Sequence, residues 1–201
     1  MIVENEFDLS PSFYLSGYEY PQNVDLVPLG TLFDINKGSL SAASANGGDY
    51  PFFTSSEEPR RHDTWTNEGE AICIPIVSAT GHGHAAIKTI HYAIGRYAVS
   101  TITAILTPKP DTQISVSFVY FFLLTHKDEL LVPLMRGAAN VSLNLDRLKN
   151  LRIPVPRDNQ KQVTILNDLV SAQRNIDDAC QALRVAEIEY STVLERFRNT
   201  F

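Results

Sequence analysis

Two arginines and three hydroxyl side chains lie close together in a polar stretch that follows the apolar run Tyr50–Phe53. Arginine binds guanine edges and phosphates, while serine and threonine contact either bases or the sugar-phosphate backbone. Nucleic-acid contact is therefore one interpretation of this stretch. The alternative is a solvated loop in which Glu57 and Glu58 pair with the arginines. The candidate contact residues are Thr54, Ser55, Ser56, Arg60 and Arg61.

Two histidines separated by a glycine, His82 and His84, indicate a second kind of chemistry, because imidazole is a common metal ligand. With His91 they define the hypothesis of a metal-dependent hydrolase, and Cys73 is a further candidate ligand. A His-Gly-His segment does not by itself supply a tetrahedral ligand set, so a tight turn leading into a strand over 85–88 is the simpler expectation. In that arrangement, the turn with His82 is a candidate for contact with a DNA backbone.

Two further loops carry a basic residue beside a glycine. Lys37 precedes a Ser/Ala/Gly/Asn-rich loop over 38–49, and Arg136 opens the segment that ends at Asn140. Backbone amides next to Arg136 can hold a phosphate, which makes Arg136 and Asn140 candidate contacts, and Lys37 is a further candidate. The alternative is that each glycine only permits a turn between two elements.

Catalytic patterns are absent from the sequence. No Ser/His/Asp or Cys/His combination has a setting typical of nucleophilic catalysis, and no G-x-x-x-x-G-K-[S/T] loop occurs. We therefore expect no catalysis by this chain, no cofactor and no metal. Two cysteines far apart, Cys73 and Cys180, give no disulfide or zinc framework and favour a reduced, cytoplasmic setting.

The elements that position these residues include both strands and helices. Short strands are expected over Tyr50–Thr54, Ala71–Val77 and Tyr97–Leu106, and a buried helix or strand over Val116–Thr125. Trp65, Tyr92, Tyr97 and the aromatic cluster over Phe118–Phe122 are expected in the core, and the alternative is that they stack on bases. The fold class is therefore α+β, with an acidic arm over 1–25, a globular α/β domain over 26–157 and a long helix over 158–201.

The C-terminal helix has an apolar seam of the coiled-coil type. Apolar residues recur at alternating spacings of three and four, and no Gly or Pro follows Pro156. Such a helix is about 60 Å long, whereas a compact domain of the remaining size is only about 30–40 Å across. The seam therefore needs a partner helix, and we expect a homodimer. The predicted seam residues are Ile165, Leu169, Ala172, Ile176, Ala179, Leu183, Ala186, Tyr190, Val193 and Phe197.

The charge distribution limits the strength of any DNA binding. The net charge is −6, and residues 26–158 carry twelve basic and twelve acidic side chains. A neutral domain lacks the basic surface typical of DNA-binding proteins, so modest affinity is expected from this chain alone. No apolar run is long enough to cross a membrane, and we expect no membrane association.

Several short motifs in fixed order resemble the specificity subunit of type I restriction–modification enzymes. The first are Val27-Pro28-Leu29-Gly30 and the segment 50–56. Then come Gly137-x-x-Asn140-x-Ser142-Leu143-Asn144 and Leu148-x-x-Leu151-x-Ile153-Pro154-Val155-Pro156, and finally Gln160 and Gln162 at the head of the helix. The resemblance covers residues from about 27 to 201.

This resemblance implies a function without catalysis. In that family, a target-recognition domain reads half of a split DNA sequence, and long helices form an antiparallel coiled coil that spaces two such domains. The partners implied are double-stranded DNA, modification subunits that methylate adenine with S-adenosylmethionine, and a restriction subunit.

The usual subunit has two recognition domains and two helices, whereas this chain has one of each. It is therefore either a natural half-subunit or a fragment of a longer chain. The alternative function is a protein-interaction scaffold that dimerises through its helix. The recognised bases depend on side-chain placement that the sequence alone does not provide.

Overall fold

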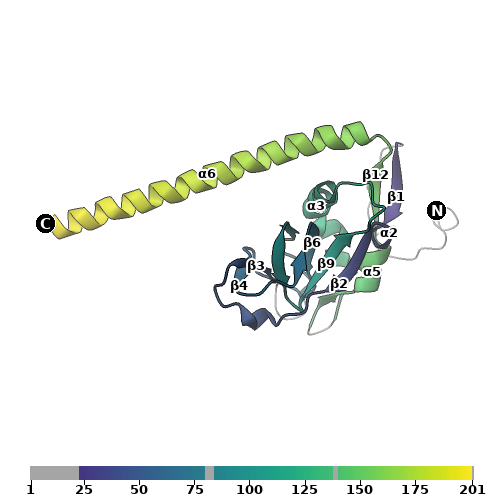
Figure 1. Cartoon of the computed structure of the whole chain (residues 1–201), viewed down its shortest axis with the longest axis horizontal. Coiled ribbons are helices and arrows are strands. Elements are labelled where there is room, and N and C mark those ends of the chain that lie inside the picture. The colour runs from purple at the N-terminus through teal and green to yellow at the C-terminus, as the bar shows by residue number, and fades with distance from the viewer. Residues whose placement is uncertain (1–22, 80–83, 138–139, 201) are drawn as a thin grey trace. The chain divides into compact units, whose positions relative to one another are not determined.

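A computed structural model describes residues 23–79, 84–137 and 140–200 of the chain. These residues divide into two units, which meet between Arg157 and Asp158. The first is a mixed α/β unit and the second is a single helix (Figure 1), which confirms the predicted fold class. Residues 1–22 of the expected arm lie outside the described residues, and Val24 and Asp25 belong to the first strand.

A four-stranded antiparallel sheet in the order β2-β9-β6-β7 forms the centre of the first unit. The two inner strands are buried on both faces. Ile72 and Leu106 belong to one hydrophobic cluster, while Cys73 and Ile105 belong to another. Burial on both faces explains why β6 is apolar throughout instead of alternating. The strands are β2 (Phe33–Lys37), β9 (Thr103–Pro108), β6 (Ala71–Pro75) and β7 (His91–Ala93).

A second, smaller sheet packs against one face of the central sheet. Its order is β4-β3-β8-β5, with β3 and β8 parallel. Phe53, Tyr97 and Val99 of this sheet share a buried cluster with residues of β6 and β9. The strands are β4 (Arg60–His62), β3 (Tyr50–Phe53), β8 (Arg96–Val99) and β5 (Asn67–Glu68).

The single strand predicted over Tyr97–Leu106 is wrong. The structure contains two strands there, because β8 ends at Val99 and β9 begins at Thr103. A turn separates them, in which the Thr103 amide donates to the Ser100 carbonyl at 3.0 Å. Since β8 and β9 belong to different sheets, the chain changes layer at this turn.

Helices lie against the central sheet, and the longest of them in the first unit is α3 (Val116–Thr125). Val119 and Leu123 of α3 are buried, and Tyr120 lies 5.4 Å from Tyr92 of β7 between ring centroids. The segment predicted as a helix or strand is therefore a helix. Shorter elements follow: α4 (Lys127–Leu130), η2 (Val132–Leu134), β10 (Met135–Arg136) and β11 (Ser142–Leu143).

Two motifs far apart in the sequence pair directly before the long helix. Strand β1 (Val24–Pro28) runs antiparallel to β12 (Arg152–Pro156), with Val27 opposite Ile153. Gly30 lies in the short helix α2 (Leu29–Leu32), where an added Cβ would come within 3.1 Å of the Lys149 Cβ on α5 (Leu145–Asn150). The glycine therefore allows α2 to pack closely on α5.

Helix α5 begins where it does because Asn144 caps it. The Asn144 side-chain oxygen accepts hydrogen bonds from the amides of Asp146 and Arg147 at 2.9 and 3.0 Å. Such a cap satisfies amides that have no partner inside the helix. The cap is part of the motif that joins β11 to β12.

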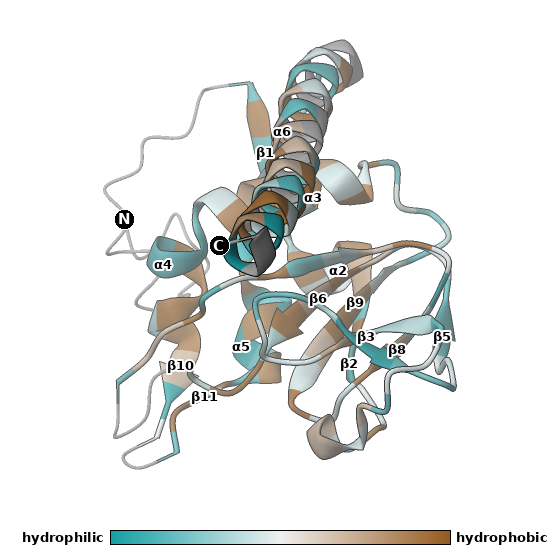
Figure 2. Ribbon diagram, turned by 90° about the vertical axis from the view of Figure 1, so that its left-hand side faces the viewer, coloured by the Kyte–Doolittle hydropathy of each residue, from teal (hydrophilic) through white to brown (hydrophobic). Residues whose placement is uncertain are grey.

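The second unit is the helix α6 (Asn159–Thr200), and it confirms the long helix expected from the sequence. Figure 2 shows brown apolar and teal polar residues alternating along it. Its large apolar side chains are well exposed, with Leu183, Tyr190 and Phe197 all above 60%. No described helix is long and apolar enough to cross a membrane.

Candidate nucleic-acid interface

Most of the candidate contact residues are gathered at one end of the central sheet. Lys37 ends β2 opposite Ala104, and Pro75 ends β6 opposite Thr103, so both strands end where β9 begins. The Ser100 amide donates to the Phe53 carbonyl at 3.0 Å, which brings the end of β3 to the same place. Loops that are distant in the sequence therefore meet there.

The turn after β3 is ordered by its own hydroxyl groups. Thr54 is only 3% exposed, and its Oγ1 accepts a hydrogen bond from the Ser56 amide at 3.2 Å. Ser56 Oγ donates to the Glu58 carbonyl at 2.7 Å. Thr54 therefore shapes the turn and does not face solvent, while Ser55 and Ser56 are half-buried at its surface.

The two arginines hold the 38–49 loop through its backbone. Arg61 Nε donates to the Gly48 carbonyl at 3.0 Å, and the same guanidinium donates to the Asp49 carbonyl. Arg60 makes a longer bond of 3.5 Å to the Ala42 carbonyl, in the short helix η1 (Ala42–Ser44). Both arginines are exposed and lie on β4, side by side with this loop.

The alternative interpretation of this stretch, in which Glu57 pairs with an arginine, is wrong for this residue. The Glu57 carboxylate pairs with Lys88 at 3.3 Å instead. The turn after β3 carries Glu57 toward the segment 84–90, whereas the arginines are directed to the 38–49 loop by carbonyl acceptors. His62, the next residue of β4, is buried and packs edge-on against Phe52.

The second group of candidates lies on the β10–β11 hairpin. The Leu143 amide donates to the Ile76 carbonyl at 2.7 Å, and the Ser78 amide donates to the Val141 carbonyl at 3.0 Å. This hairpin therefore adjoins the chain that leaves β6. Arg136 is exposed and its Nη1 donates to the carbonyls of Pro133 and Met135, while Asn140 is exposed.

The loop that carries the paired histidines is only partly described. His82 lies outside the described residues. The strand expected over 85–88 is wrong, because residues 84–90 are irregular. The Ala79 amide donates to the Ala86 carbonyl at 2.9 Å, and Ser78 Oγ accepts from the Ala86 amide at 3.1 Å. These two hydrogen bonds join the ends of the loop, but they are not the regular backbone pairing of two β-strands.

No group of three His, Cys, Asp or Glu side chains that could hold a metal ion occurs among the described residues. His91 is only 7% exposed, and its Nε2 lies 3.0 Å from the Ser56 carbonyl. Burial raises the pKa of the Cys73 thiol well above its ordinary value. Both side chains are therefore occupied in packing and hydrogen bonding.

A scan of the sequence against protein families matches the type I restriction modification DNA specificity domain over residues 21–178. The match spans most of the chain and includes every motif on which the resemblance was based. The chain belongs to this family. No curated protein matches the sequence.

Solved structures of specificity subunits have the same fold. The S subunit from M. genitalium superposes with a TM-score of 0.63 at 18% identity, covering 80% of this chain and 42% of that one. The HsdS subunit from Thermoanaerobacter tengcongensis gives 0.51 at 18% identity, covering 87% and 44%. A chain from a study of complex assembly and conformational transition of the type I R-M system gives 0.55 at 19%, covering 97% and 50%. This specificity-domain chain thus spans half or less of each of them.

One residue that the sequence placed in the core lies at the surface of the specificity domain. Trp65 is 38% exposed, and the Arg96 guanidinium carbon lies 4.9 Å from its ring centroid. Arg96 also pairs with Glu68 at 3.3 Å. The polar neighbours of Trp65 in the sequence were the available signal, because an aromatic residue in such a stretch is often at a binding surface.

We expect the specificity domain to lose stability as the solution becomes acidic, because of His91. Burial lowers the pKa of His91 below its ordinary value of 6.5, although the Ser56 hydrogen bond partly opposes this. The unfolded chain therefore takes up a proton at a higher pH than the folded chain. The stability from neutral His91 is complete above about pH 6.5 and declines as the pH falls toward the lower, folded pKa.

Urea unfolding of the parent and of His91→Gln across this range measures the effect. The glutamine amide can still donate to the Ser56 carbonyl but does not titrate, so its stability should vary less with pH. Equal pH dependence in both proteins would show that another group is responsible.

Proposed function

We propose that this chain recognises one half of a split DNA sequence through the end of the central sheet where β2, β3 and β6 meet β9. The observation that carries this proposal is the gathering of basic and polar side chains from separate loops at that end, in a chain of the DNA specificity family. The proposed contact surface comprises Lys37, Ser55, Ser56, Arg60 and Arg61 together with Arg136 and Asn140.

Exposure and hydrogen bonding assign different roles to these residues. Arg60 is exposed and makes one long hydrogen bond of 3.5 Å, so its guanidinium can turn toward a base or phosphate at little cost. Arg61 and buried Thr54 support the loop and the turn. The surface pair of Trp65 and Arg96 adds an aromatic face and a cation near the same small sheet, suited to stacking and to a phosphate.

Membership of the DNA specificity family supports the proposed partners. Helix α6 pairs with a second such helix and sets the distance between two recognition units. The assembly holds modification subunits that methylate adenine, and a restriction subunit joins it in the cytoplasm. This chain binds and positions DNA and contributes no catalytic group.

Selection from a random duplex library tests the proposal. The chain alone, and the chain with its modification subunit, should both enrich one common half-site. Binding should weaken steeply with added salt, and the modification subunit should raise the affinity by adding phosphate contacts. Enrichment of no sequence by either preparation would contradict a role in DNA recognition.

The scaffold hypothesis remains the second candidate because of the charge balance. Residues 26–158 carry equal numbers of acidic and basic side chains, and exposed Asp49 and Asp63 lie next to Arg61, one in the loop that Arg61 holds and the other directly after β4. A scaffold would form the same helical dimer but would enrich no DNA sequence, so the same selection separates the two functions.

A further inference from the structure

Helix α6 exposes an apolar seam whose two columns differ in size. One column holds large residues at 169, 176, 183, 190 and 197, and the other holds alanine at 172, 179 and 186. The described members of the large column are 39% to 66% exposed. Such a surface on a helix of 42 residues requires a partner with a complementary pattern.

We infer that a second copy of this chain covers the seam in one antiparallel register, in which the two-fold axis crosses the seam at the level of residue 181. This inference rests on the pairing of α6 in the proposed function and specifies how the pair is aligned. In an antiparallel pair, residues at equal distances from the axis face each other. The facing pairs are Ile165 with Phe197, Leu169 with Val193, Ala172 with Tyr190, Ile176 with Ala186, and Ala179 with Leu183.

This register places a small or branched side chain opposite each large one. All ten seam positions pair with one another, and alternating sizes across an interface let side chains interdigitate without voids. In a parallel pair, each position would instead face its own copy, so that Tyr190 meets tyrosine and Ala179 meets alanine. Layers of the interface with two large side chains would then be wider than layers with two alanines.

Neighbouring antiparallel registers fit less well. A shift by one heptad in one direction puts Phe197 opposite the partner's Asp158 and Val193 opposite the partner's Gln162. A shift in the other direction puts Leu169 opposite the partner's Thr200. Each alternative exposes one end of the seam or places a polar residue against it.

The residues that flank the seam support the same alignment. With the axis at Gln181, Asp168 lies beside the partner's Arg196, and by symmetry this ion pair forms twice. Both residues are exposed. In a parallel pair, Asp168 would lie beside the partner's Gln173, which has no charge. Opposite charges at flanking positions select the partner and its orientation.

The opposite flank is also self-complementary. Leu166 lies beside the partner's Leu194, Gln173 beside the partner's Glu187, and Cys180 beside the partner's Cys180. The register therefore brings two copies of one cysteine together at the two-fold axis. It also sets the two Asp158 residues about 70 Å apart at roughly 1.5 Å per residue.

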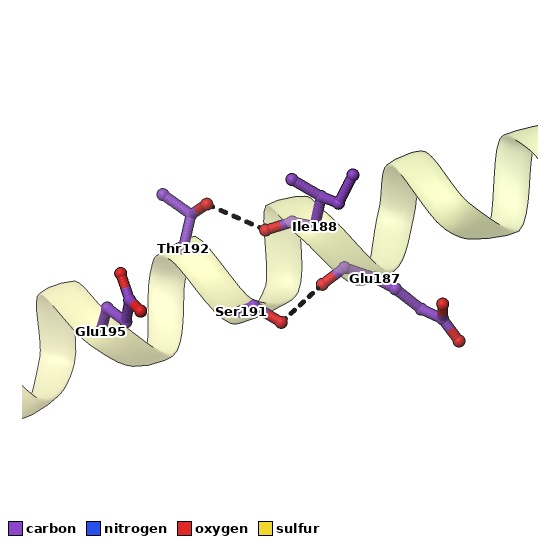
Figure 3. A pocket seen from close by; sticks show the side chains of 5 residues that line it. All are labelled: Glu187, Ile188, Ser191, Thr192 and Glu195. Atoms are coloured by element: carbon purple, nitrogen blue, oxygen red, sulfur yellow. Dashed lines mark hydrogen bonds between the residues drawn. The ribbon is translucent and has the colours of Figure 1, made fainter. Parts of the chain in front are cut away.

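The outward face of α6 has a different character. Figure 3 shows five side chains of this one helix, Glu187, Ile188, Ser191, Thr192 and Glu195, which line an open pocket. Ser191 Oγ donates to the Glu187 carbonyl at 2.8 Å, and Thr192 Oγ1 donates to the Ile188 carbonyl at 2.9 Å. These hydroxyl donors are satisfied within the helix.

Thiol cross-linking of the full chain without DNA tests the register. A short bis-maleimide should join two parent chains through Cys180, and Cys180→Ser should abolish the product because Cys73 is buried. Two further chains, Gln173→Cys and Glu187→Cys, each also carrying Cys180→Ser, should cross-link only when they are mixed.

Other products would overturn the inference. Self-cross-linking of both single-cysteine chains would indicate a parallel pair, and preferential linkage of Gln173→Cys to native Cys180 would indicate a shift by one heptad. Sedimentation separates these results from a failure of the proposed function. A monomer would overturn the register and the homodimer together, whereas a dimer with another linkage would overturn only the register.

A charge exchange gives an independent measurement. Asp168→Arg should weaken the dimer by about three- to tenfold in dissociation constant, because two arginines then face each other twice. Adding Arg196→Asp to the same chain should restore the parent value. If the double variant is as weak as the single one, the two positions do not face each other.

Discussion

Replacing Arg60 and Arg61 together by alanine should weaken binding to the cognate duplex by about 2–4 kcal/mol, if both arginines contribute to recognition. Both side chains are exposed on β4, where Arg60 lies opposite Phe52 near the end of β3 and Arg61 is held by the 38–49 loop. A fluorescence-anisotropy titration at fixed salt measures the loss. The enriched half-site should be compared with unrelated duplexes, because base contacts and phosphate contacts are distinguished by that ratio.

The two single variants should differ in their effects on stability. Arg61→Ala removes hydrogen bonds to the carbonyls of Gly48 and Asp49, so it should destabilise the 38–49 loop as well as weaken DNA binding. Arg60→Ala removes only the 3.5 Å bond to the Ala42 carbonyl. We therefore expect Arg60→Ala to weaken binding at nearly unchanged unfolding free energy.

A matched control removes the same charge elsewhere. Arg147 and Lys149 are exposed on α5, which packs against α2 at the start of β2, whereas Lys37 lies at the other end of that strand. The Arg147→Ala, Lys149→Ala double variant should bind the half-site almost as tightly as the parent. If the Arg60, Arg61 double variant also binds like the parent, this loop does not contact DNA.

Features with a local signal were predicted well. The heptad pattern of α6 and the uninterrupted apolar run of β6 are both read over consecutive residues, and both elements occur where the sequence indicated. The split between β8 and β9 had no such signal. Ser100 and Thr101 have ordinary strand propensity, and the chain turns there because its two ends pair in different sheets.

The candidate site shows the same distinction between local and non-local information. Residue types indicated which side chains could contact DNA, but their partners come from distant segments. Arg61 is held by Gly48 and Asp49, and Glu57 by Lys88. The burial of Thr54 and the exposure of Trp65 likewise depend on how the small sheet packs, which local propensity does not encode.

Replacing Ala179 by leucine should loosen the helical dimer by about 1–3 kcal/mol, the usual cost of overpacking. Ala179 lies in the column of small residues, where a short side chain lets two helix axes approach to the lower end of the usual range of about 8–10 Å. In the antiparallel register, the added leucine meets the partner's Leu183, and the clash occurs twice because of the two-fold axis. Sedimentation equilibrium measures the change.

The same variant should alter the distance between two half-sites while leaving the bases within each half-site unchanged. Residue 179 belongs to α6, outside the α/β unit that carries the candidate DNA contacts, so an effect on target choice must come through the spacing of two recognition units. A register shift of one heptad changes the separation of the two Asp158 residues by about 10 Å, or about three base pairs at 3.4 Å each. Methylome mapping in a host that expresses the variant would reveal such a change.

Gln181→Leu is the matched control, since it adds a leucine to the same turn on the exposed face opposite the seam. It should leave both dimer stability and target spacing as they are in the parent. Both variants place a leucine, which is a good helix former, on the same turn, so a difference between them reports the seam itself. If Ala179→Leu behaves like Gln181→Leu in both measurements, the helices pair through a different face.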